Sequence, residues 1–148
     1  MTDKMDNLDK KILKSMFSGE GVGAKMTELA NELSVSRSTI NLRVGKLQSK
    51  GIVTGYKPEI DWEKLGYDLI TYIGLVCPDE AVGGLIQALK KEESIYEIRE
   101  ITTGTFDLLI KCRFRGYSEM KKLHKSIMGV EGVRDADIWL LGPSYTEE

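Results

Sequence analysis

The first part of the chain places apolar residues at the spacing of a helix. Three of them recur at every fourth position: Leu8, Ile12 and Met16. This period predicts a helix with one apolar side. Asp6 precedes the helix and Asp9 follows three residues later, which is typical of a capped helix start. Three glycines then predict the loop that ends this helix: Gly19, Gly21 and Gly23.

Two more helices are predicted between residues 27 and 49, separated by a short break. The first has apolar residues close together on one side: Leu29, Ala30 and Leu33. In the break, Val35 is expected to fill the core and Ser36 to cap the next helix. That helix, residues 37–49, has a polar side opposite three apolar residues: Ile40, Val44 and Leu47. Two helices joined by so short a turn indicate a helix-turn-helix.

The residues after the third helix suggest where the first domain ends. Residues 52–58 are β-prone but are broken by glycine and proline, so we interpret them as a small wing or strand. Residues 59–67 are interpreted as a linker. We therefore expect a winged helix-turn-helix domain at residues 1–58 and a second domain at residues 68–148.

The second half of the chain changes from helical spacing to strand-like runs. The strand-like segments are residues 69–77, 95–103, 106–114 and 133–141, and the helical ones are residues 81–91 and 117–128. Their order, β-α-β-β-α-β, is that of the split βαβ plan of ferredoxin-like folds. The fold class expected for the whole chain is therefore α+β.

The first of these strands bears on assembly. Both alternating faces of residues 69–77 are largely apolar. Helices can cover only one face of a sheet, so the other face would be left as an exposed apolar surface. A second copy of the same domain is the simplest cover, which predicts a two-fold homodimer.

Charge separates the two halves of the chain. The net charge of −2 conceals 11 basic against 9 acidic residues in 1–67, a net of +2, and 10 against 14 in 68–148, a net of −4. Residues 33–58 contain no acidic residue and five basic ones: Arg37, Arg43, Lys46, Lys50 and Lys57. Such a patch attracts a phosphate backbone, although a solvated helix face is the simpler explanation of charge alone.

The remaining composition indicates an ordinary cytoplasmic protein. Cys77 and Cys112 are too few for a disulfide scaffold or a metal quartet, and both lie in strand-like runs where cysteine acts as a small hydrophobe. No apolar run approaches the roughly 20 residues that a membrane helix needs, and the start of the chain lacks a signal-peptide core.

The outward side of the third helix is suited to double-stranded DNA. Its residues are Arg37, Ser38, Asn41 and Lys46, with Thr39 and Arg43 flanking. Arginine can fork onto guanine, asparagine can pair with adenine, and hydroxyls can bond phosphates or bases. The contacts to the DNA backbone are expected from Ser36, Ser38 and Lys50, and those to bases from Arg37, Asn41 and Arg43. A dimer would present two such helices to a roughly palindromic site.

Gly45 is unusual inside this helix, because an interior glycine costs about 1 kcal/mol relative to alanine. Close approach to a neighbouring helix or to DNA would account for it.

Several motifs resemble the Lrp/AsnC, or feast/famine, family of transcriptional regulators. In the first half they are residues 6–13, Glu28-Leu29-Ala30, residues 36–40, Arg43-Val44 and residues 51–56. In the second half they are residues 65–68, residues 103–109 and Gly132-Val133. Each motif is short, but their order and spacing cover nearly the whole chain.

The resemblance implies a regulator whose ferredoxin-like domain dimerises through its sheet and assembles into octamers or similar rings. It also implies an amino acid or related effector, bound where dimers meet near the loop between the second and third strands. By position, Gly104 and Asp107 match the family's Gly-x-x-Asp, with Thr102 and Thr103 beside them. Aspartate can pair with an α-ammonium group, and threonine hydroxyls can bond a carboxylate. Thr105 stands where many relatives carry an acidic or other polar residue.

Two other classes of function are considered. Siroheme decarboxylases resemble the same two-domain plan, but they need basic residues including histidine around a tetrapyrrole, and His124 is the only histidine here. The sequence contains no arrangement typical of a catalytic, metal or cofactor site, so we expect no enzyme activity and no cofactor. A purely structural or ligand-buffering oligomer is the other alternative, and it predicts no salt-sensitive DNA binding.

Overall fold

The computed structural model describes residues 5–17 and 26–145. The chain divides into two compact units, one formed by residues 1–58 with 144–148 and the other by residues 59–143. The predicted loop with Gly19, Gly21 and Gly23 lies outside the described residues.

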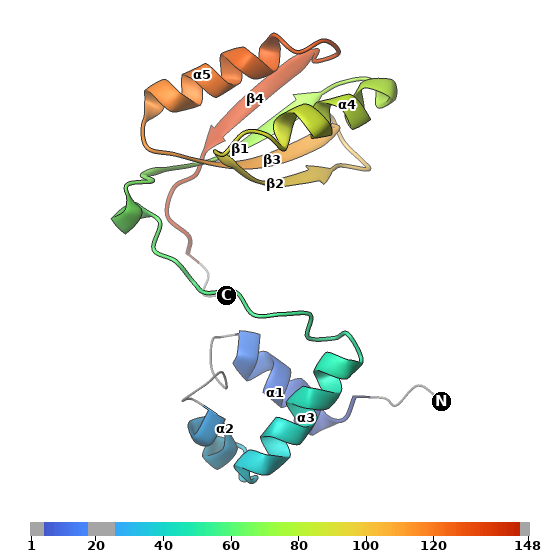
Figure 1. Cartoon of the computed structure of the whole chain (residues 1–148), viewed down its shortest axis with the longest axis vertical. Coiled ribbons are helices and arrows are strands. Elements are labelled where there is room, and N and C mark those ends of the chain that lie inside the picture. The colour runs from blue at the N-terminus through green and yellow to red at the C-terminus, as the bar shows by residue number, and fades with distance from the viewer. Residues whose placement is uncertain (1–4, 18–25, 146–148) are drawn as a thin grey trace. The chain divides into compact units, whose positions relative to one another are not determined.

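In its described residues, the N-terminal unit consists of three helices around one small apolar core. They are α1 (Asn7–Phe17), α2 (Met26–Glu32) and α3 (Arg37–Ser49) (Figure 1). The buried residues are Ile12, Leu29, Ala30, Ile40, Val44 and Leu47. The predicted apolar stripes of the second and third helices are therefore confirmed, and α3 has the predicted bounds.

The two aspartates at the start of α1 cap that helix as predicted. The backbone N–H of Asp9 donates to Asp6 Oδ1 at 2.9 Å, and the N–H of Asp6 donates to Asp9 Oδ2 at 3.2 Å. This reciprocal pair satisfies two donors that a helix N-terminus leaves without intrahelical partners.

The turn between α2 and α3 also follows the prediction. Ser34 has a left-handed backbone with φ of 54°, and the N–H of Val35 returns to the carbonyl of Ala30 at 2.9 Å. Val35 packs against the apolar core of the unit, and Ser36 is the N-cap of α3. The turn thereby fixes where α3 starts.

The residues after α3, 52–58, are interpreted from the sequence as a small wing or strand, and of these the structure forms no strand. Gly51, which has a φ of 68°, lies just after the end of α3 and is followed by irregular chain. Two glycines and a proline within residues 51–58 explain this, because neither residue type supports a strand interior.

The residues expected to form a linker, 59–67, belong to the C-terminal unit. Residues 63–65 form a short 3₁₀ helix that Trp62 precedes. The guanidinium of Arg113 lies between two aromatic rings, 3.6 Å from the centre of Trp62 and 3.9 Å from that of Tyr96. These cation–π contacts hold residues near 62 onto the sheet.

The C-terminal unit has the predicted order of strands and helices. Its elements are β1 (Leu69–Val76), α4 (Asp79–Leu89), β2 (Ile95–Glu100), β3 (Leu108–Phe114), α5 (Tyr117–Met128) and β4 (Asp135–Leu140). The sheet has the order β2-β3-β1-β4, with each neighbouring pair antiparallel. Figure 1 shows α4 and α5 on the same side of this sheet. The ferredoxin-like prediction is therefore confirmed.

The core of this unit lies between the sheet and the two helices. Leucines of α4 and α5, such as Leu85 and Leu123, pack against the inward side chains of β1 and β3. Both cysteines are buried here, and burial raises the pKa of the Cys112 thiol to about 12. A thiol this far from ionising acts as a small hydrophobe, as the sequence predicted.

The outward face of the sheet is partly covered by its own aromatic side chains. Gly74 in the middle of β1 is buried, and the rings of Phe106 and Trp139 meet above it edge to face, with centres 5.2 Å apart. A Cβ at Gly74 would lie 2.7 Å from the Trp139 ring and 2.8 Å from Phe106. Glycine is therefore what allows the two rings to close over the strand.

We expect Gly74→Ala to destabilise the C-terminal unit by about 1–3 kcal/mol, the usual cost of forcing a methyl group into a packed site. Urea unfolding followed by tryptophan fluorescence measures this, because both tryptophans, Trp62 and Trp139, lie in that unit. Gly83→Ala is the matched control: it lies in α4 with open space around its Cβ, so it should not destabilise the unit. Equal stability of Gly74→Ala and wild type would contradict the packing argument.

Candidate nucleic-acid interface and effector pocket

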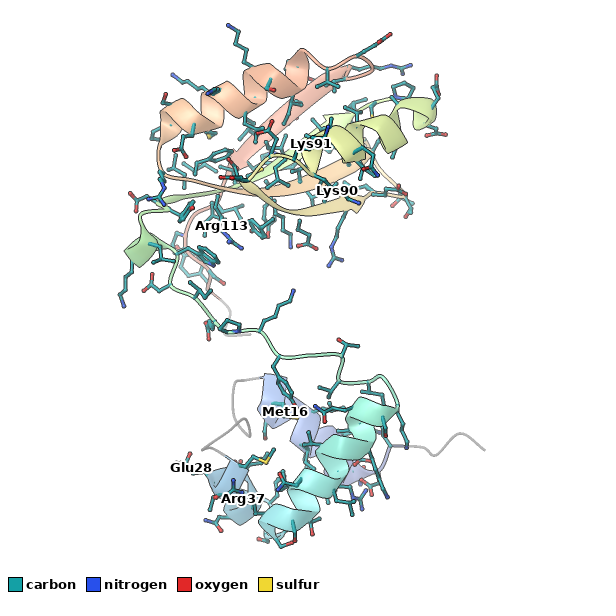
Figure 2. All side chains as sticks on the ribbon, viewed as in Figure 1. Met16, Glu28, Arg37, Lys90, Lys91 and Arg113 are labelled. Carbon is teal, nitrogen blue, oxygen red and sulfur yellow. The ribbon has the colours of Figure 1, made fainter. Side chains whose placement is uncertain are left out.

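The polar side of α3 is open to solvent. Of the eight residues predicted to contact DNA, six are exposed: Ser36, Arg37, Ser38, Asn41, Lys46 and Lys50. Thr39 and Arg43 are half-buried. Arg37, labelled in Figure 2, is the first residue of the helix. The first turn holds no acidic residue, so the positive end of the helix dipole is left for an anion.

Ser36 is engaged by its own helix. Its hydroxyl accepts a hydrogen bond from the Thr39 N–H at 3.1 Å and lies 2.8 Å from the Thr39 hydroxyl and 2.9 Å from that of Ser38. The three hydroxyls thus form one cluster at the start of α3. Within it, Ser36 serves first as the helix cap, and the exposed Ser38 is better placed for an outside partner.

Arg43 is held by the capped start of α1. Its Nη1 donates to Asp6 Oδ2 at 2.5 Å and lies 3.4 Å from Asp9 Oδ1. The pKa of Asp6 is lowered, first by the Asp9 N–H that it accepts and then by Arg43, and the pKa of Arg43 is raised by Asp6. The base contact predicted for Arg43 would require its guanidinium to leave these carboxylates.

Leu42 and Gly45 were not among the predicted contact residues, yet they lie on the exposed side of α3. Leu42 is 61% exposed, although it is a large apolar side chain. The sequence contained a signal for this position, because Leu42 stands two residues from the buried stripe and a two-residue step crosses to the far side of a helix. Leu42 was not predicted because a DNA-contacting side of a helix is expected to be polar, and leucine is apolar.

The predicted effector residues lie at the turn between β2 and β3. Three of them are exposed: Thr102, Thr103 and Gly104. Gly104 has φ of 107°, a conformation that side-chain-bearing residues rarely adopt. The turn therefore depends on glycine at this position.

Asp107 is half-buried and ties three segments together. Its Oδ2 accepts the Cys77 N–H at 2.9 Å, its N–H donates to the Leu75 carbonyl, and its carbonyl accepts from the Ile101 N–H, both at 2.8 Å. It also lines a cavity of about 230 Å³ with Asp79, Val82, Glu100 and Ile101. The two threonines and Gly104 are not among the residues that line this cavity.

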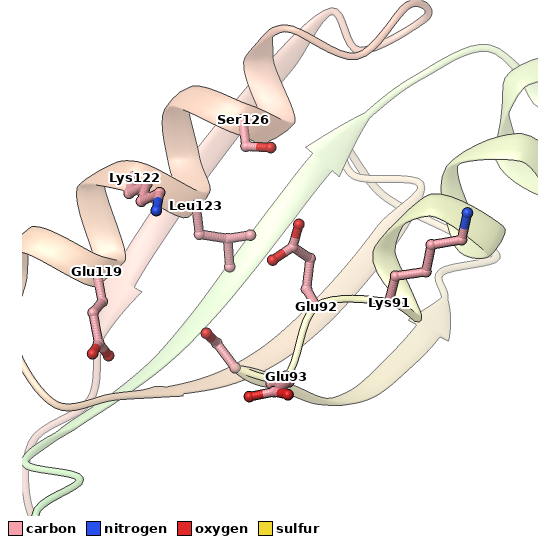
Figure 3. Close-up of a pocket in the computed structure, with 8 residues that line it drawn as sticks. Lys91, Glu92, Glu93, Glu119, Lys122, Leu123 and Ser126 are labelled. Atoms are coloured by element: carbon pink, nitrogen blue, oxygen red, sulfur yellow. The ribbon is translucent and has the colours of Figure 1, made fainter.

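Another recess of about 470 Å³ lies between α5 and the turn that follows α4 (Figure 3). Exposed side chains of both charges surround it, above the buried Leu123. None of the predicted site residues lines it.

His124 is satisfied inside its own unit. Its Nε2 lies 3.1 Å from the Ala136 carbonyl oxygen, which fits a hydrogen bond that fastens α5 to β4. Within residues 5–17 and 26–145, no cluster of histidine, cysteine and carboxylate side chains could hold a metal ion. In the same ranges, no helix has the length and apolar character needed to cross a bilayer.

A three-helix unit with a basic exposed helix, joined to a ferredoxin-like unit, defines a class of two-domain helix-turn-helix proteins. A family model described as winged helix-turn-helix DNA-binding matches residues 5–54. The regulatory protein AsnC of Escherichia coli K12 is 33% identical over 119 residues, which cover 79% of this chain and 76% of AsnC. An uncharacterised helix-turn-helix transcriptional regulator of Pyrococcus furiosus is 28% identical over 88% of this chain and 86% of its own.

Solved structures have the same architecture. Escherichia coli AsnC matches with a TM-score of 0.80 at 25% identity, over 98% of this chain and 97% of that one. A transcriptional regulator of Neisseria meningitidis, solved as a complex with L-Met, matches with a TM-score of 0.83 at 20% identity, over 97% and 93%.

The chain belongs to the Lrp/AsnC family of transcriptional regulators, as its motifs indicated. It is accordingly a DNA-binding regulator.

Proposed function

We propose that this regulator is cytoplasmic and reads a specific DNA sequence by placing α3 in the major groove. The observation that carries the proposal is the exposed side of α3, which combines Arg37, Asn41 and Lys46 with a helix start free of acidic residues. Arg37 and Asn41 contact bases, while Ser38 and Lys50 contact phosphates. Ser36, Thr39 and Arg43 complete the interface, with Arg43 the least suited because its partners are Asp6 and Asp9.

Residues 1–58 form the DNA-binding domain in this proposal, residues 59–67 join it to the second domain, and residues 68–148 sense the effector and mediate assembly. The change of compact unit between Pro58 and Glu59 supports the first of these boundaries.

The effector in this proposal is an amino acid or a related small molecule. It binds beside Asp107, with Thr102, Thr103 and Gly104 contributing from the neighbouring turn, where two dimers meet. Asp107 borders a cavity of about 230 Å³, large enough for such a molecule, and its carboxylate can pair with an ammonium group. The L-Met complex of the Neisseria meningitidis regulator supports this class of ligand.

We also propose a homodimer formed through the outward face of the sheet, assembling further into an octamer or a similar ring. On β1 this face presents Ile70, Tyr72 and Val76, all half-buried, and α4 and α5 both lie on the other side of the sheet (Figure 1). Burying these side chains against a second copy removes apolar surface from water.

The enzyme alternative is less well supported. A tetrapyrrole decarboxylase needs a histidine directed at its substrate, whereas the ring of His124 is bonded to the Ala136 carbonyl. We therefore propose that the chain regulates transcription without catalysing a reaction and without a cofactor.

For DNA binding, we expect Arg37→Ala to weaken the complex about 5- to 100-fold, the usual value of an arginine–guanine contact. Mobility-shift titration on fragments selected from genomic DNA by the wild-type protein measures it. Lys90→Ala is the control, because it removes an exposed cation from the C-terminal unit. If the wild-type protein shows no salt-sensitive binding to any DNA fragment, the proposed function is wrong.

For the effector, Asp107→Asn should weaken binding of the amino acid about tenfold or more, since a charge-assisted hydrogen bond is lost. The amide oxygen can still accept the Cys77 N–H, so the fold is retained. Calorimetry with a panel of amino acids, including L-methionine, provides the measurement. Asp68→Asn, at an exposed residue before β1, is the matched control. An unchanged affinity in Asp107→Asn would place the effector elsewhere.

For assembly, light scattering at micromolar concentration should find the wild-type chain as a dimer or a multiple of it. Ile70→Glu should shift it toward monomer, because it would place a carboxylate in the apolar face proposed to be buried between the two copies. Within one chain the new carboxylate lies opposite Arg113 and is tolerated. Met128→Glu, on an exposed part of α5, should leave the mass unchanged. A monomeric wild type would exclude the dimer.

A further inference from the structure

The centre of the exposed side of α3 is occupied by small or apolar residues, and the charged residues lie around them. We call this central set the strip. The strip consists of Ser38, Leu42 and Gly45, which have the same 0, 4, 7 spacing as the buried stripe of Ile40, Val44 and Leu47. The two sets are displaced by two residues, which is roughly 200° around a helix. The strip therefore lies almost directly opposite the core.

Among the residues that the structure describes, nothing requires Leu42 to be apolar. It is 61% exposed, and it does not belong to the residues that pack against the core of its unit. A polar residue would be better solvated at this position. The side chain therefore suits a partner outside the chain.

Gly45 likewise has no explanation within residues 5–17 and 26–145. A Cβ built on it meets nothing within 4 Å, and its φ is not among the positive values that require glycine. Alanine would fit and would strengthen the helix. What glycine provides here is a flat helix surface next to Leu42.

The surroundings of the strip indicate what covers it. Asn41 and Lys46 flank it on its two sides, and Arg37 stands at the helix start. Leu42 and the side-chain-free surface at Gly45, set between polar and cationic side chains, are complementary to the floor of the major groove. There, the thymine C5-methyl is the one apolar group, and phosphates line both edges.

We propose that Leu42 and Gly45, the middle and far end of the strip, read thymine: Leu42 packs on a thymine methyl group, and Gly45 lets the helix axis come close enough for that contact. Ser38, in the first turn of α3, keeps its proposed contact to phosphates. This inference depends on the proposed insertion of α3 into the major groove. It adds an apolar specificity contact to the polar ones, and it gives Gly45 a function that outweighs its cost to the helix.

The methyl contact is tested by a double-mutant cycle between protein and DNA. In the selected site, each thymine is replaced in turn by deoxyuridine, which lacks only the methyl group. Wild-type affinity should fall about fourfold at the contacted thymine, the value of one buried methyl group. Leu42→Ala should lose about as much on the normal site and nothing further on the deoxyuridine site. Circular dichroism should show an intact fold, because Leu42 is exposed.

The close approach is tested with Gly45→Ala. Its added methyl should raise the thermal midpoint of the N-terminal helices by about 4 °C while weakening DNA binding about fivefold or more. Gly84→Ala is the matched control, since it is an exposed glycine in α4 with the same open space around its Cβ. It should add stability to its own unit and leave the DNA affinity unchanged.

The outcomes separate this inference from the proposed function. Wild-type protein that binds no specific DNA overturns both. Specific binding that is indifferent to every deoxyuridine substitution, or to Leu42→Ala, overturns the methyl contact and leaves the proposed function standing. If Gly45→Ala is more stable than wild type and binds DNA as tightly, then Gly45 is not needed for a close approach to DNA. Binding lost in Leu42→Ala equally on both sites would assign Leu42 to a partner other than a thymine methyl.

Discussion

The burial of three side chains on α3 decides most of what this protein can do. Ile40, Val44 and Leu47 pack against residues of α1 and α2, and this contact orients the helix. Because the helix is rigid, burying one side presents the opposite side to solvent at a fixed angle. The basic, hydroxyl and apolar groups exposed there form one surface only while that packing holds. Without it the sequence would still be basic, but it would not be shaped to enter a groove.

Several charged side chains that could contact a ligand also make hydrogen bonds or ion pairs within the fold. Asp6 and Asp9 cap α1 and also hold Arg43, so the helix start and the side of α3 are joined by the same two carboxylates. Asp107 similarly fixes the Cys77 N–H while it borders a cavity. A carboxylate bonded to a backbone donor is well oriented, and preorganised groups bind with a smaller entropic cost. The structural role of Asp107 is therefore compatible with the proposed ligand contact, whereas Arg43 would have to leave Asp6 and Asp9 before it could contact DNA.

The sheet shows how one small residue shapes a surface. Gly74 lets Phe106 and Trp139 close over the middle of β1, which covers part of the face that would otherwise be bare. Arg113 between Trp62 and Tyr96 adds a second covered area and fixes the segment before β1. The outward residues of β1 that remain, Ile70, Tyr72 and Val76, are half-buried, and the proposed dimer would cover them.

The sequence alone determined the features that depend on neighbouring residues. The bounds of α3, the caps by Asp6 and Ser36, and the order of strands and helices follow from periodicity and local hydrogen bonds, which act within a few residues. Only the tertiary structure decided that Arg43 pairs with carboxylates more than thirty residues away, and that the expected linker packs on Arg113. It likewise decided that Leu42 stays in solvent. These depend on which surfaces meet in space, and a pattern along the chain carries no distance between segments that the fold brings together.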